Sequence, residues 1–195
     1  IDELIQPTID EIKDVLGGDY RKSILFLKGA HLNDDNISQV ENDYVKALMI
    51  DKNMINDPFV RSKIHFMIKK RINDAKTGVV KVHGNFSIIS GDLYALCQSM
   101  FGLEVTGLLK AGELYSEYWK NINAEKVAVF RAPMTCHNNI KLLKVSHDSE
   151  ASYWFRYMST ITILDSWDTT CDALNGADKD GDMVLLTDNQ VLVNN

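Results

Sequence analysis

The sequence predicts an α+β fold, with a mainly helical region over residues 1–76 followed by a closed β-barrel over residues 77–195. Apolar residues in the first part recur at helical spacing, whereas the second part contains many short apolar runs separated by turn residues. Those runs are irregularly spaced and interrupted by helical segments, which is more typical of a barrel than of a doubly wound sheet. A hydrophobic content of 45% with 25% charged residues is typical of a globular domain.

Two elements are predicted at the start of the helical region. Residues 8–16 form an amphipathic helix, with Thr8 as its cap and Glu11 as the partner in a capping box. Gly17 and Gly18 follow this segment and are expected to end the helix. The apolar run at residues 23–27 predicts a short strand, which a polar loop follows.

Two further helices are predicted before residue 77. The first covers residues 40–50. Asp57 caps the second, because Pro58 is well suited to a first helical position. Ile64, Ile68 and Ile72 recur every four residues along it and are expected to form its buried stripe.

The second part is predicted to consist of short strands and one helix. The helix covers residues 93–101 and ends at Gly102. Short apolar runs bounded by turn residues predict strands at residues 79–82, 86–89, 114–119, 127–131, 140–145, 161–164, 183–186 and 190–193.

Acidic residues concentrate near the end of the sequence. Seven Asp residues and one Lys lie between Asp165 and Asp188, a sum of −6 that equals the formal charge of the whole chain. This stretch contains the run Asp178-Lys179-Asp180-Gly181-Asp182. Two carboxylates about 5 Å apart repel by roughly 3 kcal/mol at an effective dielectric constant near 20. The fold must therefore leave these groups in water or place a cation between them.

The spacing of the three Asp residues would also suit a cation site. Residues two apart in an extended chain project to the same side, so Asp178, Asp180 and Asp182 are expected to converge. Gly181 permits a sharp turn, and hard oxygen ligands on a compact loop suit Mg²⁺. A solvated acidic turn is the competing interpretation. An EF-hand does not fit, because a loop beginning at Asp178 would place Met183 where glycine is required.

Two other groups of residues are candidates for binding an anion. A predicted strand ends in a loop that carries Arg131 and Pro133, and the guanidinium fork suits phosphate or carboxylate. The alternative is a turn whose Arg pairs with a surface acid. The helix from Asp57 to Lys76 has a net charge of +4. A solvated face explains this by default, but a basic strip would also suit a polyanion.

The cysteine residues and the hydropathy of the sequence indicate which cellular compartment to expect. Cys97, Cys136 and Cys171 are odd in number and widely spaced, so neither a disulfide framework nor a thiol zinc site is expected, and a reducing cytoplasm fits best. No apolar stretch approaches the roughly 18 residues of a membrane span, so a membrane is not expected among the partners.

Three motifs follow one another within residues 107–182: Gly107-Leu108-Leu109-Lys110-Ala111-Gly112-Glu113-Leu114-Tyr115, Arg131-Ala132-Pro133 and Asp178-Lys179-Asp180-Gly181-Asp182. With these motifs in this order, the region resembles the catalytic double-psi β-barrel of the two-barrel RNA polymerases. That family includes the largest subunit of cellular RNA polymerase and the RNA-silencing RNA-dependent RNA polymerases. Its metal motif, Asp-x-Asp-Gly-Asp, matches Asp178-Lys179-Asp180-Gly181-Asp182. Arg131-Ala132-Pro133 resembles the Arg-x-Pro that the cellular enzymes place near the incoming nucleotide. Residues 107–115 are similar to the Gly-x-Leu-x-x-Gly-Glu-x-Phe stretch of the silencing enzymes. The arrangement is most similar to single-chain homologues of bacterial mobile elements.

The resemblance implies an RNA polymerase that carries out Mg²⁺-dependent nucleotidyl transfer from nucleoside triphosphates to an RNA 3′ end. Asp178, Asp180 and Asp182 would be its catalytic metal ligands, and Arg131, Pro133 and Asn175 would lie near the nucleotide. Two departures stand out. Lys179 replaces a residue that is usually aromatic or aliphatic, and Gly176 stands where the cellular enzymes have an Asn, with Asn175 one place earlier.

The resemblance also implies partners: an RNA product, a DNA or RNA template, and a second polymerase barrel or the rest of a longer chain. The family's second barrel supplies lysines to the phosphates, and 195 residues leave no obvious room for it. Two other functions stay open: a non-catalytic β-barrel interaction domain with an acidic loop, and a metal-dependent nuclease.

Overall fold

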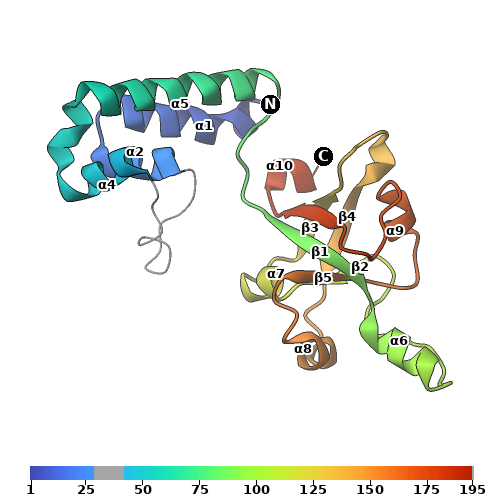
Figure 1. Ribbon diagram of the computed structural model, residues 1–195. Coiled ribbons are helices and arrows are strands. Elements are labelled where there is room, and N and C mark those ends of the chain that lie inside the picture. Colours follow the sequence, from blue (N-terminus) through green and yellow to red (C-terminus); the bar gives the residue numbers. More distant parts are fainter. Residues whose placement is uncertain (29–41, 195) are drawn as a thin grey trace. The chain divides into compact units, whose positions relative to one another are not determined.

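The computed structural model describes residues 1–28 and 42–194 (Figure 1). The chain forms two compact units, Ile1–Lys81 and Val82–Asn195. The described part of the first unit is helical, and the second contains a closed barrel of six strands. The predicted α+β class, with a helical N-terminal region and a closed barrel, is confirmed. No helix in the described part of the chain combines the length and hydropathy that a membrane-spanning segment needs.

The helical unit is built around one apolar core. Its elements are α1 (Asp2–Leu16), α2 (Tyr20–Lys28), α4 (Asp43–Ile50), the 3-10 helix η1 (Lys52–Asn56) and α5 (Pro58–Lys76). Val15 of α1, Phe26 of α2, Leu48 of α4 and Ile64 of α5 are buried in the same cluster. Figure 1 shows α5 running beside α1, in agreement with this shared core.

The longest helix begins where the sequence predicts. The Asp57 carboxylate accepts hydrogen bonds from the backbone N–H groups of Phe59 and Val60, and Pro58 is the first residue of α5. Ile64 and Ile68 are buried as predicted, but Ile72 is 40% exposed. The buried stripe therefore stops at Ile68, where the core cluster ends.

Two predictions in the helical unit are wrong. The first helix begins at Asp2 rather than residue 8, so Thr8 is buried inside α1 and caps nothing. The predicted strand at residues 23–27 is part of α2, whose first turn is held by Asp19, which accepts from Arg21 and Lys22 N–H groups. A five-residue apolar run fits either a strand or one face of a helix, so periodicity alone could not decide. Of the predicted helix 40–50, residues 43–50 form α4, and residues 40 and 41 lie outside the described residues.

The second unit closes into a barrel with the strand order β1-β5-β2-β4-β3-β6. The strands are β1 (Asn85–Gly91), β2 (Glu113–Tyr115), β3 (Lys126–Phe130), β4 (Ile140–Val145), β5 (Ile161–Leu164) and β6 (Met183–Thr187). The connecting helices are α6 (Leu93–Met100), α7 (Glu117–Asn121), η2 (His137–Asn139), α8 (Ser149–Phe155), α9 (Thr170–Ala173) and α10 (Gln190–Val193). Every strand contributes a side chain to a core cluster inside this unit, which also contains Trp119 of α7.

The strand pairings have a two-fold pattern. β1 pairs in parallel with β5, and β4 pairs in parallel with β2. β1 pairs antiparallel with β6, and β4 does so with β3, while the β2–β5 and β3–β6 pairs are both antiparallel. Exchanging β1, β2 and β3 with β4, β5 and β6 leaves this set of pairings unchanged. The barrel thus consists of two interlocked halves of three strands.

Most predicted strands of the barrel are confirmed, and three segments differ. Residues 79–82 form no strand, β2 ends at Tyr115 with α7 following, and residues 190–193 form the helix α10. Asn189 caps α10 by accepting from the Val191 N–H. Because β6 already pairs with β1 and β3, the barrel is closed and offers no edge to a further strand.

Gly84, just before β1, is required by a close backbone contact. A Cβ at this position would lie 2.5 Å from the carbonyl oxygen of Leu186. We expect Gly84→Ala to destabilise the barrel by about 2 kcal/mol or more, because backbone must move to accommodate the methyl group. The measurement is urea denaturation followed by tryptophan fluorescence, since Trp119, Trp154 and Trp167 all belong to the barrel unit.

Gly91→Ala is the matched control for Gly84→Ala. The nearest atoms to a Cβ at Gly91 would belong to the flexible end of Lys179, with Nζ at 2.9 Å. We expect a change within about 1 kcal/mol. An equal decrease in the free energy of unfolding in the two variants would contradict the claim that the contact with Leu186 requires glycine at position 84.

Candidate metal centre

The loop that joins α9 to β6 carries the three acidic residues. Gly181 has a φ of 128°, which turns the loop sharply between Asp180 and Asp182. The carbonyl oxygen of Asp182 accepts from the N–H of Ile89 in β1 at 2.9 Å, so the end of the loop is fixed to the barrel wall. The loop is therefore anchored by the barrel rather than free in solvent.

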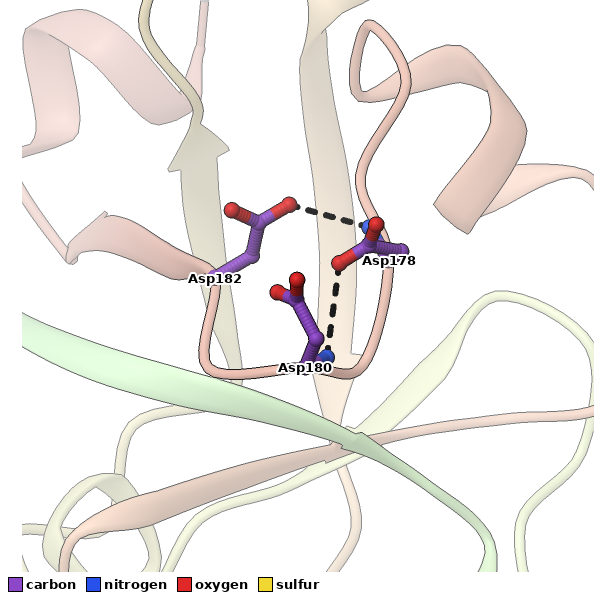
Figure 2. A group of neighbouring side chains, drawn as sticks. All are labelled: Asp178, Asp180 and Asp182. Carbon is purple, nitrogen blue, oxygen red and sulfur yellow. Dashed lines mark hydrogen bonds between the residues drawn. The ribbon is translucent and has the colours of Figure 1, made fainter.

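The carboxyl groups of Asp178, Asp180 and Asp182 face one another (Figure 2). Each offers one oxygen atom, and these three atoms lie within 4.8 Å of one another. Two backbone groups help to hold them: the Asp178 N–H donates to Oδ2 of Asp182 at 3.0 Å, and the Asp180 N–H donates to Oδ1 of Asp178 at 3.3 Å. Asp178 and Asp180 are exposed, and Asp182 is half-buried. The three carboxyl groups therefore converge in the structure, as their spacing in the sequence predicts.

The carboxyl groups of Asp180 and Asp182 differ in their affinity for protons, since their pKa values are shifted in opposite directions. Asp178 raises the pKa of Asp180, first through a hydrogen bond between the two side chains and then through charge repulsion. The pKa of Asp182 is lowered, first by the hydrogen bond from the Asp178 N–H and then by the charge of Arg131, although desolvation opposes this. One end of the cluster is already balanced by a protein cation, whereas the Asp178–Asp180 end is not.

This donor set fits a small divalent cation. Octahedral Mg²⁺ with bonds of about 2.1 Å places neighbouring oxygen ligands about 3 Å apart and opposite ones about 4 Å apart. The three oxygen atoms lie within 4.8 Å of one another, which exceeds the distance between opposite ligands by less than 1 Å and that between neighbouring ligands by less than 2 Å. Because Asp178 and Asp180 are exposed, small side-chain rotations can close the difference, and water can fill the remaining positions.

The structure brings the other predicted site residues to the same place. Arg131, at the end of β3, donates through Nη2 to Oδ2 of Asp182 at 2.6 Å and through Nη1 to the carbonyl oxygen of Asn175 at 2.6 Å. The Asn175 side chain donates from Nδ2 to the carbonyl oxygen of Pro133 at 2.7 Å. Asn175 has a φ of 53° and Gly176 one of 68°, so the chain turns here before entering the acidic loop. Arg131, Pro133 and Asn175 thus form one connected wall next to the three Asp residues.

Sequence reasoning missed Asn139, which orders this wall. Its side chain is 3% exposed. Oδ1 accepts from the N–H groups of Thr135 and Cys136, and Nδ2 donates to the carbonyl oxygen of Ala173. It therefore connects the loop after β3 to α9, some 34 residues later. Nothing in the sequence distinguishes Asn139 from the Asn before it, because its contact with Ala173 joins segments that are distant along the chain.

Lys179, the unusual residue within the motif, lies against the barrel. Its Nζ would be 2.9 Å from a Cβ on Gly91, so the lysine side chain covers the glycine at the end of β1. The absent side chain of Gly91 provides the space that Lys179 fills. A long cation at this position is therefore accommodated without displacing the acidic loop.

Arg131→Gln is expected to raise the pKa of Asp182 toward the ordinary value for Asp, because a neighbouring cation is removed. A depressed carboxyl pKa stabilises the folded protein above the pKa of the unfolded state, near 3.9, and this stabilisation is lost as the pH falls through the folded-state pKa. The variant should therefore lose part of the stability of the wild type at pH 6. The measurement is a carboxyl ¹³C NMR titration, with Lys141→Gln as the control, and an unchanged Asp182 pKa would contradict the electrostatic coupling.

Comparison with known proteins gives one informative result. No protein-family model matches the chain, and no curated protein sequence does. Among solved structures, the fold is similar to that of the RNA-dependent RNA polymerase QDE-1 from Thielavia terrestris, with a TM-score of 0.63 and 10% sequence identity. The alignment covers 98% of this chain and 22% of the polymerase chain. The likeness establishes a shared fold over a part of the polymerase that is about a fifth of its length.

Proposed function

We propose that this chain contains the catalytic barrel of an RNA polymerase and carries out nucleotidyl transfer from nucleoside triphosphates to an RNA 3′ end. The observation that carries the proposal is the gathering of three carboxylates on a loop anchored to a closed barrel. The fold similarity to an RNA-dependent RNA polymerase supports the same reaction class. Residues 77–195 would be the catalytic domain and residues 1–76 a helical flank.

Asp178, Asp180 and Asp182 would hold Mg²⁺. The bound ion would supply positive charge that favours ionisation of the attacking 3′ hydroxyl and neutralises the phosphates. The residues of the chain provide positioning rather than a nucleophile. Asp182, balanced by Arg131, stays ionised, and Asp178 and Asp180 lie open to solvent where a substrate can approach.

The wall made by Arg131, Pro133 and Asn175 would contact the incoming nucleotide. Arg131 uses Nη1 and Nη2 for Asn175 and Asp182, and Nε makes no hydrogen bond to any described residue. A guanidinium with a free donor beside a metal site suits a phosphate or ribose oxygen. Arg131 thus has two roles in the proposal, since it orients Asp182 and binds the nucleotide.

The two-fold pattern of strand pairings supports a double-psi barrel as the specific topology. In that topology two similar halves interlock, and here the first strand of each half pairs in parallel with the second strand of the other. The chain covers only 22% of the polymerase that it resembles. We therefore include a second barrel, or the rest of a longer chain, among the partners, together with an RNA product and a DNA or RNA template.

Primer extension tests the proposal. The full-length protein, with Mg²⁺ and all four nucleoside triphosphates, should lengthen an annealed RNA primer on an RNA or a DNA template. Shortening of the primer without any need for triphosphates would replace the proposal with a metal-dependent nuclease. Failure to extend on either template, with the RNA left intact, would count against catalysis.

One observation favours a second candidate, a non-catalytic interaction barrel. Arg131 already neutralises part of the acidic loop from within the protein, as a loop kept for stability or for partner binding would require. This candidate predicts no specific divalent-cation binding, whereas the polymerase proposal requires it.

A further inference from the structure

Helix α5 carries a surface that the helical core does not use. Val60, Ile64 and Ile68 face the core, while Phe59 and Phe66 are 60% and 66% exposed. The two phenylalanines are seven residues apart, which places them on one face of the helix about 10.5 Å apart along its axis. Two large rings thus project from α5 without contributing to the core.

Lysines surround both rings. Lys63 Nζ lies 5.1 Å from the centre of the Phe59 ring. Lys69 and Lys70 are exposed and stand three and four residues after Phe66, so they are its neighbours on the helix surface. We call Phe59, Lys63, Phe66, Lys69 and Lys70 the α5 strip. Aromatic rings and cations alternate along it.

The positive charge of α5 is not balanced locally. Residues 1–81 contain thirteen cationic and thirteen anionic side chains, yet the segment Asp57–Lys76 holds six of the cations and two of the anions. Within the described residues, no Lys or Arg of α5 forms an ion pair, whereas Lys13, Lys22, Lys46 and Lys81 each do. The helix therefore presents cations that are available to an anionic partner.

A shallow hollow adjoins the strip at the start of α5. It is lined by Asn56, Pro58, Arg61, Ser62 and His65. Asn, Arg, Ser and His side chains all donate hydrogen bonds, and Arg is well suited to phosphate oxygens. The hollow extends the surface for anion binding beyond the strip itself.

We propose that the α5 strip binds single-stranded nucleic acid, with bases stacked on Phe59 and Phe66 and phosphates held by Lys63, Lys69 and Lys70. Base–aromatic stacking beside a cationic track is the usual basis of sequence-tolerant single-strand binding. A membrane surface would need a continuous apolar face, whereas Ser62, Lys69 and Asn73 interrupt this one. The inference goes beyond the proposed nucleotidyl transfer and does not depend on the metal site.

Fluorescence anisotropy of a labelled 15-nucleotide oligouridylate, measured in EDTA over a range of salt concentrations, tests the inference. The wild-type chain should bind, and affinity should fall as salt rises. The double variant Lys69→Gln/Lys70→Gln should reduce the magnitude of the log–log salt slope by about 1.4, the change expected for two lost phosphate contacts on a single strand. Phe66→Leu should weaken binding roughly 5- to 150-fold with an unchanged slope, because stacking is lost and charge is kept.

The control is Lys13→Gln/Lys46→Gln, which removes the same charge from the same unit at positions outside α5. This variant should bind within about twofold of wild type, and circular dichroism should show all variants folded. Absence of binding by the wild type would overturn the inference, as would equal losses in the two double variants. Binding to anionic phosphatidylserine vesicles but not to the oligonucleotide would assign the strip to a membrane instead. Because EDTA removes divalent cations, this result does not depend on whether the metal site binds an ion.

Discussion

Asp180→Asn is expected to weaken Mn²⁺ or Mg²⁺ binding by at least about 100-fold and to abolish primer extension. Loss of an outer partner of a metal ligand already costs 10–100-fold, so loss of a charged ligand should cost no less. Asp180 is the cleanest of the three positions for this test. It is exposed, and the variant keeps the hydrogen bond that the backbone N–H of residue 180 donates to Asp178.

The same variant should not damage the fold. Asp178 raises the pKa of Asp180, which means that the ionised form of Asp180 is disfavoured in the metal-free protein. Replacing it with neutral Asn removes that repulsion, so thermal unfolding without metal should occur at the same or a slightly higher temperature. Loss of function with unchanged or increased stability is the pattern expected of a residue kept for binding.

Asp172→Asn is the matched control. Asp172 is an exposed carboxylate on α9 in the same acidic stretch, but it is not part of the cluster of three. It should bind the cation as the wild type does. A similar loss in Asp172→Asn and Asp180→Asn would show that the cation responds to diffuse negative charge rather than to a site.

Asp92→Ala is expected to destabilise the barrel unit by about 4 to 7 kcal/mol. Asp92 is 3% exposed. Oδ1 accepts from the N–H groups of Tyr94 and Ala95 and so caps α6, while Oδ2 accepts from those of Leu108 and Leu109 at 2.6 and 3.1 Å. Loss of a cap costs about 1 kcal/mol, and each hydrogen bond to a charged group contributes roughly 1.5–3 kcal/mol. Urea denaturation followed by tryptophan fluorescence measures the change.

Asp148→Ala separates the contribution of a helix cap from that of the hydrogen bonds from Leu108 and Leu109. Asp148 caps α8 through the N–H groups of Glu150 and Ala151, is exposed, and has no second pair of donors. Its replacement should cost about 1 kcal/mol. If the free energy of unfolding fell equally in both variants, the hydrogen bonds from Leu108 and Leu109 would make no measurable contribution to stability.

The role of Asp92 also explains the conformation of residues 107–115. Gly107 has a φ of 65°, and a Cβ there would lie 2.7 Å from Oδ2 of Asp92, so only glycine allows the carboxylate to reach the Leu108 and Leu109 N–H groups. Gly112 has a φ of 78°, and its N–H donates to the carboxylates of Asp165 and Asp168. The two glycines place this segment between β1 and the loop after β5. Gly107 and Gly112 are thus each required by a specific backbone arrangement.

The sequence predicted elements whose signals are local. Asp57 and Pro58 define the start of α5 through neighbouring atoms, and the spacing of Asp178, Asp180 and Asp182 is enough to make them converge. Residues 23–27 and 190–193 were predicted as strands and are helices, because a short apolar run takes the structure that its tertiary surroundings provide. The strand order and register of the barrel depend on pairs far apart in sequence, which a single sequence does not reveal.

The residues of the candidate site also divide into those with a local sequence signal and those whose contacts are distant along the chain. The acidic motif was visible in the sequence because its members are adjacent. The hydrogen bonds that Arg131 makes with Asp182 and Asn175 join segments more than 40 residues apart, and only the structure shows that they meet. Asn139 carried no sequence signal, since its importance comes from burial between the loop after β3 and α9.

Crystals of this chain soaked in Mn²⁺ would test the central claim most directly, because the anomalous signal of manganese locates the ion. A single strong peak is predicted among the carboxylates of Asp178, Asp180 and Asp182, at about 2.2 Å from an oxygen of each, and it should be absent from crystals of Asp180→Asn. The claim would be contradicted if these side chains turned away from one another with no peak between them, or if the manganese occupied other acidic surfaces equally.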